Sequence, residues 1–247
     1  MKSILKKGYA ALIYLFLYAP ILILIVFSFN ASKSRGNWSG FTLNWYFELF
    51  QDRQIMKALY NTMVIAVFSS AIATIIGTAA AIAIHNMRKW KRTIVMNVTY
   101  LPVVNPDIVT GLSLMILFIF TRFPLCLLSL LLAHTTFNIP YVILSVMPKL
   151  KQLDKHLYEA ALDLGATPLY AYKKVILPEI MPGVITGLLL AFTLSVDDFV
   201  ISFFTTGSGV STLSITIYSM ARRGINPKIN ALSTLLFLTV LILLVIV

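Results

Sequence analysis

The chain has 247 residues, of which 59% are hydrophobic and only 12% are charged, against about 25% charged in a typical soluble domain. This composition excludes an ordinary water-soluble protein. Because the apolar stretches far exceed the roughly ten residues of a barrel strand, it predicts an all-α membrane protein. A net charge of +11 would suggest a nucleic-acid partner for a soluble protein, but in a membrane protein it marks the cytoplasmic loops, and we expect no nucleic acid.

Apolar segments near the roughly 20 residues that span a bilayer follow one another along the chain. They cover about 9–29, 58–84, 94–120, 124–147, 183–203 and 231–247, and we expect six transmembrane helices in a single domain, residues 1–247. The basic start resembles a signal peptide, but its apolar run is too long and lacks a cleavage site, so we interpret it as a retained first helix. The sixth segment stops at Val247 without a basic anchor, so we expect the C-terminus to be cut short.

Lysine and arginine predict the orientation of these helices. The N-terminal tail and two connections between spans are basic and lie on one side of the membrane. The positive-inside rule makes that side, and with it the N-terminus, cytoplasmic. The opposite loops, 30–57 and 204–230, are longer and less densely basic, although Arg222 and Arg223 reduce the contrast. The basic residues are Lys2, Lys6 and Lys7 in the tail; Arg88, Lys89, Lys91 and Arg92 in the second connection; and Lys149, Lys151, Lys155, Lys173 and Lys174 in the fourth.

Two of the spans carry small residues at every fourth position, a pattern that lets helix backbones approach closely in lipid. We expect both stripes to pack inside one subunit rather than to form a dimer face. The stripes are Ser69, Ala73, Gly77 and Ala81 in the second span, and Gly183, Gly187, Ala191 and Ser195 in the fifth.

The third span contains an acid, and charges at membrane depth are functional candidates. Asp107 follows Pro106 and lies five residues after Pro102, and both prolines remove a backbone hydrogen bond and kink the helix. Broken backbone is tolerated there only beside protein or a wet cavity. Two interpretations stay open for Asp107: a contact with a transported substrate, or a local helix cap. In the fourth span, His134 and Asn138 share a face, and we expect a packed, hydrogen-bonded histidine.

A mixed polar and apolar segment, residues 149–182, interrupts the hydrophobic pattern on the cytoplasmic side. The apolar stripe of Leu153, Leu157, Ala161 and Leu164 predicts one short helix. Gly165 suits the left-handed residue that ends a helix, and Thr167-Pro168 is a typical start for the next. We expect that second helix to stop before Pro178, and the pair to lie at the inner membrane surface as a docking element.

Asp197 and Asp198 lie toward the outer end of the fifth span. Adjacent helical residues point about 100° apart, so both line a pore only where the helix is unwound or at the pore's edge. We expect at least one to face a substrate, while the other could pair with Arg222 or Arg223. The spans contain acids but no deeply placed lysine or arginine, and this favours a cationic cargo over an anion. The nearby Tyr and Phe side chains suit a flexible cation.

Several motifs in the cytoplasmic segment and elsewhere resemble a known family. Glu159-Ala160-Ala161, then Gly165, then Ile176-Leu177-Pro178 resemble the EAA loop of ABC importer permeases. "NPDIVTGLSL", "AHTTFNIPYVILSV" and "LSVDDFVISFFTTG" resemble the second permease subunit of spermidine/putrescine importers. The resemblance implies a type I importer permease fold, in which Glu159, Ala160, Ala161, Gly165 and Pro178 couple to an ATPase.

By the same resemblance, the partners are a homologous second permease, two ATPase subunits, an extracytoplasmic binding protein and membrane lipid. Substrate would pass Asp197 and Asp198 and then Asp107. The chain lacks G-x-x-x-x-G-K-[ST], so ATP and magnesium belong to the ATPase, and we expect neither a cofactor nor a metal site here. Alternatives are a permease for another organic cation or iron, a secondary transporter, or a membrane enzyme. The last lacks both an H-E-x-x-H motif and a Ser/His/Asp set.

Overall fold

The computed structural model describes residues 2–32, 37–154, 156–223 and 227–246. In these ranges the regular structure is helical, with one isolated antiparallel bridge between Asn30 and Phe41. The chain divides into two compact units, residues 1–57 with 216–247, and residues 58–215. The all-α prediction is confirmed.

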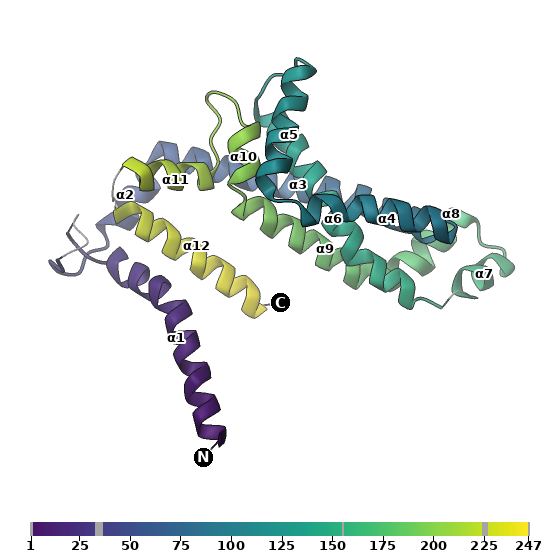
Figure 1. Cartoon of the computed structure of the whole chain (residues 1–247), viewed down its shortest axis with the longest axis horizontal. Coiled ribbons are helices and arrows are strands. Elements are labelled where there is room, and N and C mark those ends of the chain that lie inside the picture. The colour runs from purple at the N-terminus through teal and green to yellow at the C-terminus, as the bar shows by residue number, and fades with distance from the viewer. Residues whose placement is uncertain (1, 33–36, 155, 224–226, 247) are drawn as a thin grey trace. The chain divides into compact units, whose positions relative to one another are not determined.

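The first unit consists of α1 (Lys2–Ser28), α2 (Asn44–Gln51) and α12 (Pro227–Ile246), with α12 packed against both α1 and α2 (Figure 1). The Lys228 ammonium of α12 lies 3.3 Å from Glu48 and 3.5 Å from Asp52. The chain after α1 is held by Asn30, whose carbonyl accepts a 2.7 Å hydrogen bond from the Trp45 indole. α11 (Leu213–Arg223) runs across the boundary between the units.

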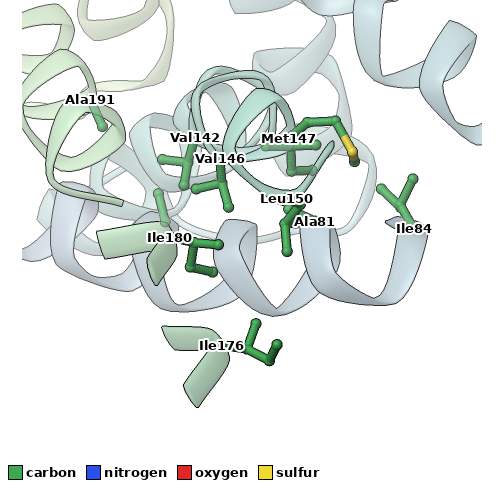
Figure 2. Packing of buried hydrophobic residues seen from close by; sticks show 11 residues of the cluster. Ala81, Ile84, Val142, Val146, Met147, Leu150, Ile176, Ile180 and Ala191 are labelled. Carbon is green, nitrogen blue, oxygen red and sulfur yellow. The ribbon is translucent and has the colours of Figure 1, made fainter. Parts of the chain in front are cut away.

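The second unit is built around α6 (Leu127–Gln152), and both small-residue stripes pack against this helix. A Cβ on Gly77 of α3 (Arg53–His85) would lie 2.8 Å from Val142, and one on Gly187 of α9 (Leu177–Asp197) would lie 3.3 Å from the same residue. Figure 2 shows Val142, Val146 and Leu150 of α6 gathered with aliphatic side chains of the two neighbouring helices. The stripes therefore serve close packing within one subunit, as expected.

Four helices are long and apolar enough to cross a membrane, with spans at Lys6–Ser28, Arg53–His85, Leu127–Gln152 and Pro168–Asp197. A fifth crossing is formed if α4 (Lys89–Val104) and α5 (Asp107–Phe120) are taken together. The sixth expected span, 231–247, coincides with α12, but some of its residues lie outside the described ones. The count of six therefore stays a prediction.

The third span is not one kinked helix, as the sequence suggested, but two helices that meet at 103°. Pro102 lies inside α4 without ending it, whereas Asn105 and Pro106 are both extended, with ψ of 144° and 136°. The ring of Pro106 disfavours helical backbone at the preceding residue, which explains why the break falls at Asn105.

The fifth span, expected at 183–203, is also wrong in its bounds. Its helix begins much earlier, at Pro168, and runs through α8 (Pro168–Ala171), a π-turn (Tyr172–Ile176) and α9 to Asp197. Asp198 is extended, and α10 (Val200–Thr205) follows as a separate short helix. Both of these spans are therefore broken, and the three acids lie at the breaks.

Candidate functional site

The cytoplasmic segment forms the expected turn between two helices. α7 (His156–Asp163) is followed two residues later by Gly165, which has a φ of +85°. The Gly165 N–H donates to Leu162 O at 2.9 Å, and the Ala166 N–H donates to Ala161 O at 3.1 Å. This pair of bonds is the Schellman motif, which requires a left-handed residue at the glycine position. A Cβ at Gly165 would meet no atom within 4 Å, so the requirement for glycine is purely conformational.

The next helix starts as expected but does not stop before Pro178. Thr167 Oγ1 accepts a 3.4 Å hydrogen bond from the Tyr170 N–H, and Pro168 occupies the first turn. The Leu177 N–H then donates to Tyr172 O, five residues back, within the π-turn. Pro178 has no N–H to donate, and the wider turn before it lets the helix continue into α9. The segment is thus joined directly to a membrane-spanning helix.

The tip of this segment presents apolar surface to solvent. The Leu164 side chain is 90% exposed, and Leu169 is 66% exposed. A shallow cavity of about 530 Å³ lies beside Leu164, lined also by Ala161, Gly165 and neighbouring residues. Apolar groups in such positions gain free energy when a partner covers them. Of the expected coupling residues, Glu159, Ala160, Gly165 and Pro178 are exposed and Ala161 is half-buried.

Contacts on the other side of the segment connect it to the end of α3. The rings of Tyr158 on α7 and Tyr172 in the π-turn lie 4.9 Å apart, and Asn86 Nδ2 donates to the Tyr172 hydroxyl at 2.9 Å. Glu159 Oε2 lies 3.5 Å from His156 Nδ1, and both side chains are largely exposed. A displacement of the segment would therefore be passed to α9 through the chain and to α3 through Asn86.

Asp107 is the first residue of α5, directly after the break, and it is exposed. Within the described ranges its carboxylate accepts no hydrogen bond from the helix N–H groups, so the geometry lends no support to the capping interpretation. It lies within electrostatic reach of Tyr141 on α6, whose ring packs against Phe137 at 5.2 Å. An exposed carboxylate within electrostatic reach of a tyrosine suits a cation.

Asp197 and Asp198 differ in their surroundings although they are adjacent. Asp197 is the last residue of α9 and is exposed. Asp198 accepts hydrogen bonds from the backbone N–H groups of Ile201 at 3.1 Å and Ser202 at 2.7 Å, and so caps α10. The side chain of Asp198 is only 8% exposed.

The expectation of a packed, hydrogen-bonded histidine is confirmed. His134 is buried, and its Nε2 lies 3.0 Å from Ser202 Oγ and 3.5 Å from Asp198 Oδ2. The roles of Ser195 and Ser202 were not expected from the sequence, in which Ser195 was taken only as a small residue of a packing stripe. A serine among glycines and alanines at membrane depth is a signal that could have revealed a polar contact between helices.

The break before α5 and the break before α10 lie at the same end of this pair of helices. α5 and α10 lie side by side (Figure 1), with Gly111 against Val200 and Ile201 near their starts. Farther along, Gly207 packs directly on the Leu125 carbonyl. Gly207 follows the end of α10, and Leu125 lies in the turn that follows α5. The two helices are therefore parallel, and the starts that carry Asp107 and Asp198 lie at the same end of the pair. The acids of two distant sequence segments thus belong to one region.

Comparison with known proteins adds to this picture. Residues 73–247 match the family model described as binding-protein-dependent transport system inner membrane component. The chain is 40% identical over 242 residues to the spermidine/putrescine transport system permease protein PotC of Escherichia coli K12, covering 98% of this chain and 92% of that protein. It is 42% identical over 229 residues to the putrescine transport system permease protein PotI of the same organism, covering 90% and 81%.

Among solved structures, a bacterial ABC transporter that imports the acidic polysaccharide alginate has a similar chain, with a TM-score of 0.75 at 17% identity. The similarity covers 98% of this chain and 92% of that one. At that identity the likeness concerns the fold alone.

Proposed function

This chain belongs to the family of binding-protein-dependent transport system inner membrane components, and within this family we propose that it conducts polyamines into the cell. As a family member it is a membrane-embedded permease subunit of an ABC importer and not an enzyme. The observation that carries the cargo assignment is the near full-length similarity to two polyamine permeases. Exposed acids at the two helix breaks provide the chemistry for a cargo with two or three ammonium groups.

Coupling to ATP is proposed to run through residues 159–178. The apolar tip at Leu164 and Leu169 would be covered by a separate ATPase subunit, two of which would serve a pair of permeases. Closure of the ATPase pair would then displace two helices. The displacement would reach α9 by way of the continuous π-turn and α3 by way of the Asn86–Tyr172 hydrogen bond. Alternating access by rocking of helix bundles around a fixed site is the motion that this connection supports.

The remaining partners are a homologous second permease and an extracytoplasmic binding protein. The alginate importer was solved in complex with its own ligand-bound periplasmic protein, which supports a similar arrangement here. The distribution of lysine and arginine supports the proposed orientation, with the N-terminus in the cytoplasm. A permease for another organic cation or for iron is the main alternative, because the fold is shared with a polysaccharide importer.

The cargo can be tested by competition. In cells that lack polyamine importers and express this chain with its partner subunits, we expect uptake of labelled putrescine or spermidine. Unlabelled polyamine in tenfold excess should reduce that uptake by about tenfold, whereas choline, arginine and ferric citrate should not. Uptake of one of those competitors in place of polyamine would replace the cargo assignment and leave the family assignment intact.

A further inference from the structure

The short helix α10 depends on its neighbours. Isolated helices below about 12 residues are marginal in water, and α10 has six residues. Its first turn is capped by Asp198, and the carbonyl of Thr205 at its end accepts a 2.9 Å hydrogen bond from Ser129 Oγ of α6. Its position is therefore fixed at both ends by polar groups.

Helix α6 holds both sides of the break between α9 and α10. His134 bonds Ser202 and lies beside Asp198 on the α10 side. One turn further along α6, Asn138 Nδ2 donates to Ser195 Oγ at 2.8 Å on the α9 side. Ser195 also bonds Ser69 of α3 at 3.0 Å, so the contact reaches a third helix.

We propose that His134 and Asn138 are positioning residues that clamp this break, so that Asp198 is locked as a helix cap and Asp197 is the acid of the pair that meets the cargo. The division of roles rests on the proposed function, but the clamp itself does not depend on which solute is carried.

The polar side chains at this break are buried, which supports a positioning role for them. His134 is 1% exposed, Asn138 and Ser202 are 0% exposed, and Ser195 is 4% exposed. Asn138 Oδ1 has no hydrogen-bond partner within the described part of the chain. Buried polar groups of this kind cost stability compared with apolar packing, and an unpaired acceptor costs more. In lipid, however, apolar packing has no hydrophobic drive, and polar contacts fix how helices meet.

The two acids are distinguished by what their oxygens contact. Both Asp198 oxygens accept backbone N–H groups, and one of them also faces His134, which leaves little of the carboxylate for a cargo. Asp197 is the last residue of α9 and is exposed, and no ion pair engages it among the described residues of its own unit, 58–215. Because the helix ends between them, the two side chains are free of the 100° constraint of a continuous helix.

The clamp is tested by measuring the geometry of the break. With Cys126→Ser as the background, which keeps an N-cap residue at the start of α6, spin labels are placed at Leu190 on α9 and Phe203 on α10. In the assembled transporter we expect one narrow distance distribution. His134→Leu and Asn138→Leu, which place a branched apolar side chain at each site and remove the polar contacts, should each broaden it at least about twofold.

Matched controls separate the clamp from general damage. A label pair at Ile185 and Leu190, both on α9, should keep its narrow distribution in every variant. His134→Gln, which retains a donor toward Asp198, should restore both the narrow distribution across the break and most of the uptake. A distribution that stays narrow in both leucine variants, or a glutamine variant as broad as the leucine variant, would overturn the clamp.

The roles of Asp197 and Asp198 are tested by comparing the uptake of spermidine with that of putrescine. Asp197→Asn should leave the distance distribution unchanged and should lower spermidine uptake more than putrescine uptake, by at least about threefold in the ratio, because spermidine carries one more charge. His134→Leu should lower both equally. An unchanged ratio in Asp197→Asn would contradict the assignment of Asp197. If the wild-type transporter carries another solute, the polyamine proposal fails while the distance result still decides the clamp.

Discussion

Replacing Gly165 by valine is expected to reduce ATP-coupled uptake to background while the subunit remains in the membrane. The φ of +85° at Gly165 is disfavoured for L-residues by about 1–2 kcal/mol, and more so for a β-branched side chain. Since a Cβ there would contact nothing within 4 Å, the variant relieves its strain by changing the backbone and not by disturbing packing. The turn would open, and α7 would no longer be held against the following helix.

The matched control is Gly165→Asn. Asparagine adopts the left-handed conformation more readily than other non-glycine residues, and the site has room for its side chain. Uptake within about threefold of wild type is expected, with ATP-dependent accumulation in vesicles as the measurement and membrane amounts checked by immunoblot. Normal uptake by the valine variant would show that the geometry of this turn is irrelevant to coupling.

Leu164→Asp is expected to weaken co-purification of the ATPase subunit by at least about tenfold. Covering a fully exposed leucine contributes about 1.5–3 kcal/mol, and 1.4 kcal/mol corresponds to a tenfold change in affinity. Leu164 is 90% exposed, so its loss costs the permease itself little, while an aspartate would have to be desolvated in the docked state.

Leu164→Met serves as the control, because it keeps an apolar side chain of similar volume and should co-purify as wild type does. Affinity purification of the assembled complex, followed by quantification of each subunit, gives the readout. Equal recovery of ATPase with the aspartate variant would mean that the partner docks elsewhere on the cytoplasmic face.

Local signals explain what could be predicted of this cytoplasmic segment. Gly165 and Thr167-Pro168 act through the backbone of their immediate neighbours, so the sequence predicted the end of one helix and the start of the next. Pro178 was misread because a proline is compatible both with a helix end and with a π-turn that lets the helix continue. The choice between them depends on how α9 packs on α6, which no local pattern reveals.

The same limit applies within the membrane. Pro106 predicted a disturbance near Asp107, but the 103° angle between α4 and α5 follows from the packing of α5 on α10 and α6. Asp197 and Asp198 look equivalent in sequence; they are distinguished by the end of α9 between them, by the N–H groups of α10 that Asp198 accepts and by His134 of α6. The hydrogen bond between Ser69 and Ser195 joins residues 126 positions apart, and a serine in a stripe of small residues indicates a polar contact without identifying its partner.

We propose that ATP hydrolysed by a separate subunit, docked on residues 159–178, drives a cation inward through this chain. The most direct measurement is accumulation of labelled spermidine in vesicles that contain this chain, the second permease and the ATPase subunits, with binding protein outside. Accumulation should require both enclosed ATP and external binding protein, and a proton gradient alone should not drive it. Gradient-driven accumulation by the permease chains without ATPase subunits would contradict this proposal.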